Sequence, residues 1–170
     1  MTRHSKCYIV TFMTFPPSEH DHAHCTGELL TRAEKLCARR GARLTEQRRD
    51  VLASVARNHA AVGAYEIIER MADHGPRPAP ITVYRALDFL VAHGLVHKIE
   101  SRNAYVACSH SHEGTPAALL LCDACGAVAE FDAPETFTSL SRRAAGHGFK
   151  AERMVLELAG KCDHCARQAA

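Results

Sequence analysis

Two Cys-x-x-Cys pairs constrain this sequence more than any other feature. Cys122 and Cys125 lie in the stretch LLLCDACGAV, and Cys162 and Cys165 lie in the stretch GKCDHC. Each pair can place two thiolates on one metal ion through a tight turn. Two pairs together supply the tetrahedral four-sulfur site that is usual for structural zinc. The intervening segment is long enough for a strand, a helix and another strand, so the sequence predicts a small subdomain closed by a metal.

The alternative for these cysteines is a single redox pair accompanied by incidental cysteines. Redox pairs usually occur singly near the start of a βαβ unit, whereas these two pairs open and close a segment. The chain has eight cysteines and twelve histidines, with a formal net charge of +2. Paired cysteine spacing without a convincing secretion signal favours a reducing cytoplasm, where thiols serve metals rather than disulfides. No apolar run approaches the roughly 20 residues that a membrane-spanning helix needs.

The first 25 residues are predicted to be a flexible, His-rich tail. Residues 1–18 loosely imitate a signal peptide but lack a small-residue cleavage site. The tract EHDHAHC that follows, which contains His20 and Cys25, could bind metal weakly or could simply be a mobile polar segment. The sequence leaves these two readings open.

Helical periodicity dominates the next part of the chain. It predicts helices over 28–40, from Thr45 onward, over 64–74 and over 82–93, with 75–80 as an extended connector. Two short strands are expected at 95–100 and 104–108, joined by a turn at 101–103. Helices followed by such a hairpin indicate a winged helix-turn-helix, whose last helix enters the major groove of DNA.

The remaining chain is predicted to form a smaller α/β unit. Strands are expected at 119–121 and 127–131, a helix at 134–147, and a last strand at 149–158 that buries Met154, Leu156 and Leu158 by alternation. This unit is too small for a good core of its own, so we expect support from zinc and from dimerisation. The predicted organisation is a tail (1–25), a winged-helix domain (26–108), a hinge (109–116) and a dimerisation and zinc-binding domain (117–170).

Several motifs in this order resemble the ferric uptake regulator family. They are RLTEQR at 43–48, AYEI at 64–67, TVYRAL at 82–87, and CDACG followed by Glu130. The longer stretches TVYRALDFL, LVHKIES and YVAC resemble the zinc-uptake branch of that family. The resemblance covers 28–165 and implies a dimeric, metal-activated transcriptional repressor. The implied fold class is α+β, with an N-terminal winged helix-turn-helix domain followed by a small C-terminal α/β dimerisation domain that carries structural zinc.

The resemblance also implies two zinc ions per subunit. Cys122, Cys125, Cys162 and Cys165 would hold the structural ion. The regulatory ion would take His97 from the wing, Cys108 at the strand end, Glu130 and a histidine from the hinge. Thr115 stands near the place expected for that histidine, so His112 is favoured and His110 is the alternative. Imidazole, thiolate and carboxylate ligands suit a zinc sensor, although His97 alone could be a surface residue of the wing.

An iron-responsive or peroxide-responsive regulator of the same family is the main alternative. Iron-type relatives carry a third site that includes a position matching His147. They also carry a His-His-Asp-His run, where this chain reads PAALLL. A third site at His147 is therefore doubtful, and His164 is expected to be a bystander. A thiolate at Cys108 favours zinc over ferrous iron and would be vulnerable to oxidation in a peroxide sensor.

Candidate DNA contacts cluster on the predicted third and fourth helices. Arg85 can bond guanine O6 and N7 together and is the best candidate for reading a base. Thr82 and Tyr84 suit a base methyl group or a phosphate, and Tyr65 suits a neighbouring base or sugar. Arg43 and Arg48 are expected to meet phosphates. Each of these side chains could instead be an ordinary solvated surface residue.

The predicted function is therefore a zinc-responsive, DNA-binding repressor of zinc-uptake genes, with zinc as corepressor. The predicted partners are double-stranded operator DNA and a second copy of the chain, with no membrane and no small-molecule substrate. No Ser-His-Asp set, phosphate loop or paired-carboxylate signature is apparent, so we do not expect an enzyme. A Cys-x-x-Cys oxidoreductase is the alternative from another class, and it would need one exposed thiol pair of low pKa.

Overall fold

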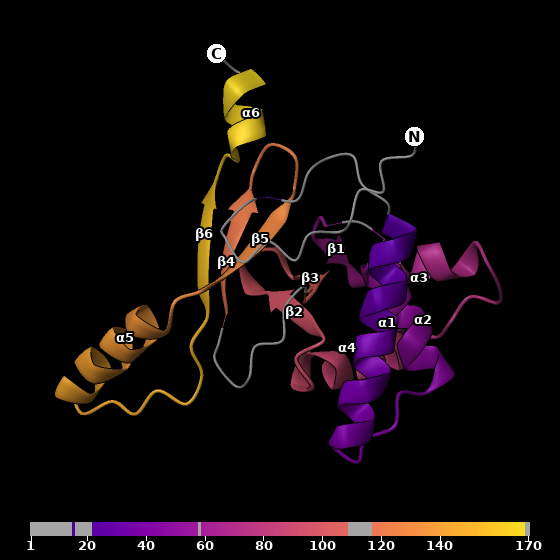
Figure 1. Cartoon of the computed structure of the whole chain (residues 1–170), viewed down its shortest axis with the longest axis horizontal. Coiled ribbons are helices and arrows are strands. Elements are labelled where there is room, and N and C mark those ends of the chain that lie inside the picture. Colours follow the sequence, from indigo (N-terminus) through magenta and orange to yellow (C-terminus); the bar gives the residue numbers. More distant parts are fainter. Residues whose placement is uncertain (1–14, 16–21, 58, 109–116, 169–170) are drawn as a thin grey trace, which may run out of the picture.

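The computed structural model describes residues 15, 22–57, 59–108 and 117–168. The sites predicted at His20, His110 and His112 lie outside the described residues. Figure 1 shows an amino-terminal half of helices and a hairpin beside a second half built around a sheet. The first half contains, in chain order, α1 (His22–Arg39), α2 (Glu46–Val55), β1 (Val62–Gly63), α3 (Ala64–Ala72), α4 (Pro80–Ala92), β2 (Val96–Ile99), the 3-10 turn η1 (Glu100–Arg102) and β3 (Ala104–Ala107).

The first two helices follow their capping chemistry. Thr45 is the N-cap of α2, as predicted, and its side chain accepts a hydrogen bond from the backbone N–H of Arg48. Helix α1 begins at His22, earlier than the start expected at Glu28. The Thr26 hydroxyl donates to the carbonyl of Ala56 at 3.3 Å. This contact ties the early turns of α1 to the end of α2, which the local sequence pattern could not indicate.

Helix α4 also begins earlier than its periodicity suggested. Pro80 is its first residue, although 75–80 was predicted to be an extended connector. Proline suits this position because its missing N–H would have no partner in the first turn of a helix. Helical spacing from Val83, Leu87 and Leu90 predicts that Val91 is buried, but Val91 is 36% exposed and Ala86 is buried instead. The buried stripe of α4 is therefore Val83, Ala86, Leu87 and Leu90.

The amino-terminal half has its own apolar core. It is formed by side chains from α1 to α4 and from the start of the hairpin; Ala33, Val51, Leu52, Ile67, Ile68, Leu87 and Leu90 are completely buried. Cys37 lies in this core, where burial raises the pKa of its thiol. The interpretation of Cys37 as a small core residue rather than a ligand therefore agrees with its surroundings.

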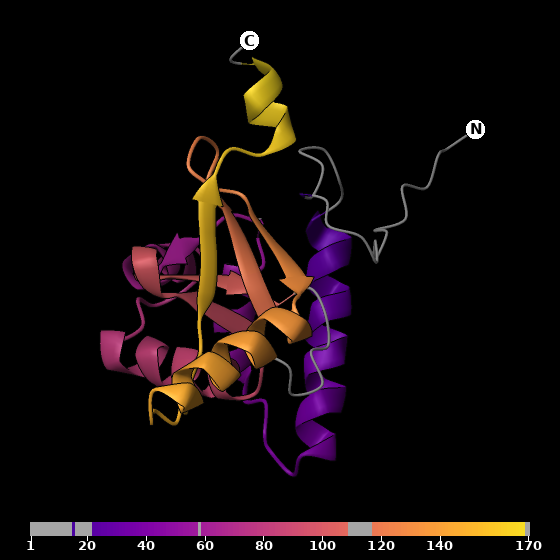
Figure 2. The same cartoon turned by 90° about the vertical axis from the view of Figure 1, so that its left-hand side faces the viewer.

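The second half consists of β4 (Ala117–Cys122), β5 (Val128–Asp132), α5 (Pro134–Gly146), β6 (Leu156–Gly160) and α6 (Asp163–Gln168). Strand β4 is central, with β5 antiparallel on one side and β6 parallel on the other. A parallel neighbour requires a crossover connection, and α5 lies in that connection. Figures 1 and 2 show α5 at the lower end of this sheet, on the side away from α1 to α4.

The last strand differs most from its prediction. Strand β6 is shorter than 149–158, and the expected burial of its alternating residues is wrong in the single chain. Leu158 is 45% exposed, while Met154 and Leu156 are only half-buried. Helical spacing predicts that Leu140 on α5 shares a buried face with Phe137, but Leu140 is 45% exposed. The apolar pattern is real, but among the residues that the structure describes these side chains remain partly exposed.

The two halves meet through backbone and apolar contacts. The hairpin β2–β3 pairs antiparallel and continues to β1, forming the sheet order β1-β3-β2. Ile99 and Val106 from this hairpin pack with Leu119, Leu121 and Val128 from the other half, and all five are at most 5% exposed. Beside them, the N–H of Val128 donates to the carbonyl of His59 at 3.0 Å. The halves are therefore joined by a packed interface as well as by the connecting chain.

Candidate metal centres and DNA-binding face

The two Cys-x-x-Cys pairs converge at one end of the second sheet. Strand β6 pairs with β4 so that Gly160 lies opposite Cys122. The two cysteine pairs therefore lie at the ends of neighbouring strands. The sulfur atoms of Cys122, Cys125, Cys162 and Cys165 all lie within 4.8 Å of one another. The Sγ atoms of Cys125 and Cys162 are 3.9 Å apart. Metal–sulfur bonds of about 2.3 Å in a tetrahedron imply sulfur–sulfur edges of about 3.8 Å, so these residues fit zinc.

Backbone hydrogen bonds shape the first of these turns. The N–H of Cys122 donates to the carbonyl of Ala127 at 2.9 Å, and the N–H of Gly126 donates to the carbonyl of Cys122 at 3.0 Å. Gly126 has a φ of +74°, in the left-handed region that other residues rarely adopt. The glycine after the first pair is therefore required for the turn that brings its two sulfurs together.

The pKa values of two of these thiols are shifted in opposite directions. Backbone N–H groups, first that of Cys162 and then that of Cys125, lower the pKa of Cys122 to about 6. Hydrogen bonding with Cys162, followed by burial, raises the pKa of Cys165 to about 12. One thiolate is stabilised by the protein itself, whereas four neighbouring thiolates require a cation between them. This arrangement is typical of a structural metal site.

A second group of ligand atoms lies between the two halves. His97 comes from β2, Cys108 follows β3, and Glu130 belongs to β5; their ligand atoms also lie within 4.8 Å of one another. The Nε2 atom of His97 is 3.3 Å from Oε2 of Glu130, and the Cys108 thiol donates to the same oxygen at 3.6 Å. The Glu130 side chain is only 4% exposed. A buried set of nitrogen, sulfur and oxygen donors suits zinc better than a hard cation.

Three structural elements position this second group. The N–H of Cys108 donates to the carbonyl of Leu95 at 3.0 Å, which continues the hairpin pairing past its last strand residue. Arg32 on α1 donates a hydrogen bond to the carbonyl of Cys108. Glu130 is held in register opposite Leu119 in the β4–β5 ladder. The sequence pointed to the three candidate ligands but not to Arg32, because the contact of Arg32 spans 76 residues along the chain.

The described histidines His147 and His164 do not join either group. His147 is the C-cap of α5, where its N–H donates to the carbonyl of Ala144. His164 shares a hydrogen bond of 3.0 Å with Gln168 on α6. Among the described residues, the two groups above are those in which at least three such side chains could hold one ion.

The predicted DNA contacts lie on the helical side of the first half. Tyr65, in the first turn of α3, is 67% exposed, and Arg85 on α4 is exposed. Thr82 is half-buried, and Tyr84 is partly packed against the apolar core instead of pointing fully to solvent. Ile81 was not predicted, yet it is 59% exposed at the start of α4. An exposed apolar residue beside a candidate base-reading arginine suits a thymine methyl group.

The two arginines that were predicted to contact DNA phosphates differ in their surroundings. Arg43 is exposed in the turn before α2. The guanidinium of Arg48 lies 3.5 Å from the centroid of the Phe89 ring and donates to the carbonyl of Arg43 at 2.6 Å. Arg48 therefore fixes the turn that presents Arg43, a role that its position in the sequence did not reveal.

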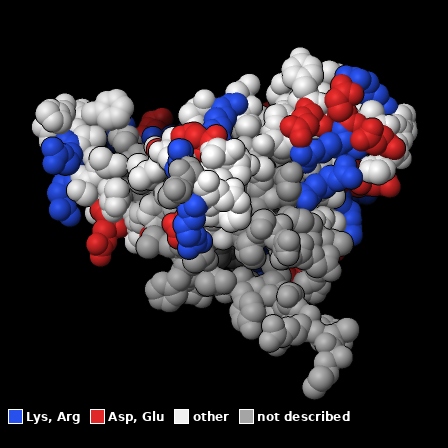
Figure 3. All heavy atoms as spheres, turned by 90° about the horizontal axis from the view of Figure 1, so that it is seen from above, with Lys and Arg blue, Asp and Glu red and all other residues white. Residues whose placement is uncertain are grey.

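Charge alone does not mark a nucleic-acid face on the side seen in Figure 3. Acidic and basic side chains are interspersed there over the helical half. Such a surface lacks the single-sign field that draws DNA without regard to sequence. No helix in the part of the chain that the structure describes is both long and apolar enough to cross a membrane.

Comparison with known proteins finds similarity over most of the chain. The profile of the Ferric uptake regulator family matches residues 39–159. The Zinc uptake regulation protein of Escherichia coli (strain K12) is 43% identical over 141 residues, which are 82% of each chain. A solved Zinc Uptake Regulator complexed with zinc and DNA superposes with a TM-score of 0.80 at 41% identity, over 85% of this chain and 98% of that one. The crystal structure of holo XcZur gives 0.76 at 39% identity, over 82% and 98%. The predicted fold class is thereby confirmed.

Proposed function

The chain belongs to the ferric uptake regulator family, and on this premise we propose that it is a zinc-responsive, DNA-binding repressor of zinc-uptake genes, with zinc as its corepressor. It is a transcriptional regulator rather than an enzyme. Similarity to a zinc uptake regulation protein and to a zinc uptake regulator complexed with zinc and DNA supports this function. The observation that carries it is the buried group of His97, Cys108 and Glu130, which joins the wing to the second sheet.

Two zinc sites per subunit follow from the two groups. The first would be held by Cys122, Cys125, Cys162 and Cys165 and would close the carboxy-terminal subdomain. The second would be held by His97, Cys108 and Glu130, and its fourth ligand would be His112 from the hinge, with His110 as the alternative. Four protein donors in a tetrahedron are usual for a zinc ion that does no catalysis.

Zinc is favoured over iron by the donor set itself. Ferrous iron prefers nitrogen and oxygen ligands, whereas the Cys108 thiolate selects a softer ion. A peroxide sensor that used this buried thiolate would also lose its ligand on oxidation. An iron-responsive or peroxide-responsive role is therefore the less favoured function.

A second copy of the chain would complete the carboxy-terminal half. Regulators of this family act on DNA as dimers. The exposed apolar residues Leu140, Phe149, Val155 and Leu158 all belong to this half. Single chains seldom leave several large apolar side chains of one domain in water without a partner. We assign the dimer contact to this surface and the DNA contact to the domain 26–108, with 109–116 as hinge and 117–170 as dimerisation domain.

By holding one ion in common, the wing and the second sheet would fix the angle between the two domains. That angle sets the separation of the two α4 helices in a dimer. Only one separation fits two half-sites on one face of DNA. His97, Cys108 and Glu130 would therefore bind zinc best in the DNA-competent arrangement and shift the population toward it. The cytoplasm, where thiols stay reduced, is the compartment in which such a site can work.

An electrophoretic shift assay tests this function. A palindromic, AT-rich operator is titrated with protein in the presence of zinc, iron(II) or manganese(II), with a scrambled duplex of equal composition as control. We expect a specific shift at the lowest metal concentration with zinc. A shift that depends on iron(II) would favour the alternative regulator, and a shift independent of any metal would contradict the proposal.

A further inference from the structure

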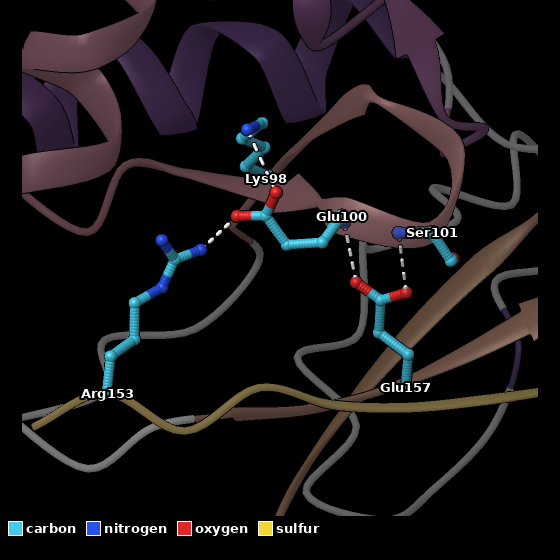
Figure 4. Close-up of polar contacts among 5 residues, drawn as sticks. All are labelled: Lys98, Glu100, Ser101, Arg153 and Glu157. Carbon is cyan, nitrogen blue, oxygen red and sulfur yellow. Dashed lines mark hydrogen bonds and ion pairs between the residues drawn. The ribbon is translucent and has the colours of Figure 1, made fainter. Parts of the chain in front are cut away.

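The tip of the wing is held by a carboxylate from the second half. Glu157 on β6 accepts hydrogen bonds from the backbone N–H groups of Glu100 at 2.7 Å and Ser101 at 3.2 Å. Figure 4 shows both oxygens of Glu157 directed at these two N–H groups in the turn between β2 and β3. The first N–H groups of such a turn have no partner within it. Glu157 supplies that partner from the other side of the domain boundary.

Two further polar contacts surround this one. Arg102, in the same turn, lies 2.7 Å from Oδ1 of Asp123, which sits between Cys122 and Cys125. Glu100 pairs with Lys98 at 2.9 Å and with Arg153, which precedes β6 (Figure 4). Hydrogen bonds from Lys98 and then Arg153 lower the pKa of Glu100, so its carboxylate stays charged at neutral pH. The wing tip is therefore tied both to β6 and to the first cysteine turn.

These contacts lie at the opposite end of the wing from the candidate regulatory site. His97 is the second residue of β2, and Glu100 directly follows the last residue of that strand. The apolar contact through Ile99 and Val106 lies along the hairpin between its two ends. One face of the hairpin is thus fixed by metal ligands at its base, by apolar packing in its middle and by Glu157 at its tip. Only the first of these three ties would depend on the regulatory zinc ion.

We propose that Glu157 is a positioning residue that sets the zinc concentration at which this protein binds DNA, an inference that rests on the proposed function. The hydrogen bonds of Glu157 exist only while the wing lies on the second sheet. They therefore favour the same arrangement that His97, Cys108 and Glu130 need in order to share an ion. When the competent arrangement is only partly populated, the apparent affinity for a ligand falls in proportion to that population. Removing Glu157 should weaken zinc binding without touching a zinc ligand.

The variant Glu157→Ala tests this role, with Glu152→Ala as the matched control. Glu152 is an exposed carboxylate in the segment leading to β6, so both variants change the net charge equally. Operator binding is measured at fixed DNA over a zinc titration buffered by a chelator. For Glu157→Ala we expect the zinc concentration at half-maximal binding to rise about tenfold, as for the loss of a charge-assisted hydrogen bond. Binding at saturating zinc should reach the wild-type level.

The readout separates positioning from general stability. If Glu157 had only a structural role, its loss would lower the thermal midpoint and release the four-cysteine zinc. Maximal operator binding would then fall as well, and saturating zinc would not restore it. Glu157→Ala should instead retain that zinc. An unchanged zinc midpoint, or binding that saturating zinc cannot restore, would overturn the inference. If Glu157→Ala does not fold, Arg102→Gln is measured in its place and should shift the midpoint in the same direction. Failure of the wild type to need zinc would reject the proposed function itself, whatever the variants do.

Discussion

His97 and Glu130 belong to different halves of the chain, yet Nε2 of His97 lies 3.3 Å from Oε2 of Glu130. Their strands are brought together by the packing of Ile99 and Val106 against β4 and β5. An imidazole and a carboxylate that share a buried boundary with the Cys108 thiol can hold one ion between them. Zinc bound here would couple to the domain arrangement, and each should then influence the other by the same factor.

Replacing one of the proposed shared ligands should abolish zinc-dependent DNA binding. Cys108→Ser should keep the four-cysteine zinc, fold and dimerise, yet fail to bind the operator at zinc levels that saturate the wild type. Cys37→Ala, which removes a buried thiol of the amino-terminal core rather than a proposed metal ligand, is the matched control. Zinc content by mass spectrometry and operator shift by electrophoresis check both. If Cys108→Ser binds DNA normally with zinc and loses binding on chelation, the sensor site lies elsewhere, and the His20–Cys25 tract becomes the next candidate.

The hinge ligand can be identified by comparing two histidine variants. His112→Ala should weaken zinc-dependent operator binding more strongly than His110→Ala, because His112 is the favoured fourth ligand. Both variants remove an imidazole from the same short segment, so each serves as a control for the other. The measurement is the zinc concentration at half-maximal shift. A larger effect of His110→Ala would reverse the assignment.

Loss of one structural cysteine should unfold or dissociate the carboxy-terminal half. In small metal-closed units the binding energy of the ion is part of the folding energy. Cys122→Ser should therefore release zinc and lower the thermal midpoint, whereas Cys37→Ala, which removes a buried thiol in the other half, should retain both ions. Circular dichroism melting and zinc content check this pair. A Cys122→Ser protein that remains folded and dimeric without the zinc would show that the site is not structural.

Local sequence patterns predicted the parts of this molecule that depend on local chemistry. The Cys-x-x-Cys turns, the Thr45 cap and the winged-helix order follow from spacing, capping and periodicity. The predicted burial of Leu158 is wrong in the single chain, because alternation shows that a side chain is apolar but not which chain covers it. Contacts that depend on strand register could not be predicted from the sequence either. Glu157 contacts the wing only because β6 pairs with β4 in one particular alignment. The same holds for Arg32 at Cys108 and for Arg48 over Phe89.

A charge on the exposed apolar surface should separate the dimer. Leu158→Glu places a carboxylate where we assign the contact between two copies, and each two-fold interface contains the change twice. At about 2 kcal/mol per copy, the dissociation constant should rise about a thousandfold. Ile81→Glu changes an apolar residue that is 59% exposed, on the other domain, and should leave the dimer intact. Sedimentation measures both; a dimer that survives Leu158→Glu with unchanged affinity would place the contact elsewhere.

Alanine substitutions of Arg85 and Arg43 should impair DNA binding in different ways. Arg85 is exposed on α4, so Arg85→Ala should lose about 1–3 kcal/mol at the contacted base pair and relax sequence preference there. Arg43 is exposed in the turn before α2, and Arg43→Ala should weaken binding to all sequences alike and reduce the salt slope by about 0.9 per lost phosphate contact. Arg142→Ala, on the exposed side of α5, controls for the loss of one positive charge. Operator and random duplexes are compared for each variant at several salt concentrations. Losing a base contact changes the ratio of the affinities for operator and random duplex, whereas losing a phosphate contact lowers both affinities together. An unchanged ratio in Arg85→Ala would therefore show that α4 is not the recognition helix.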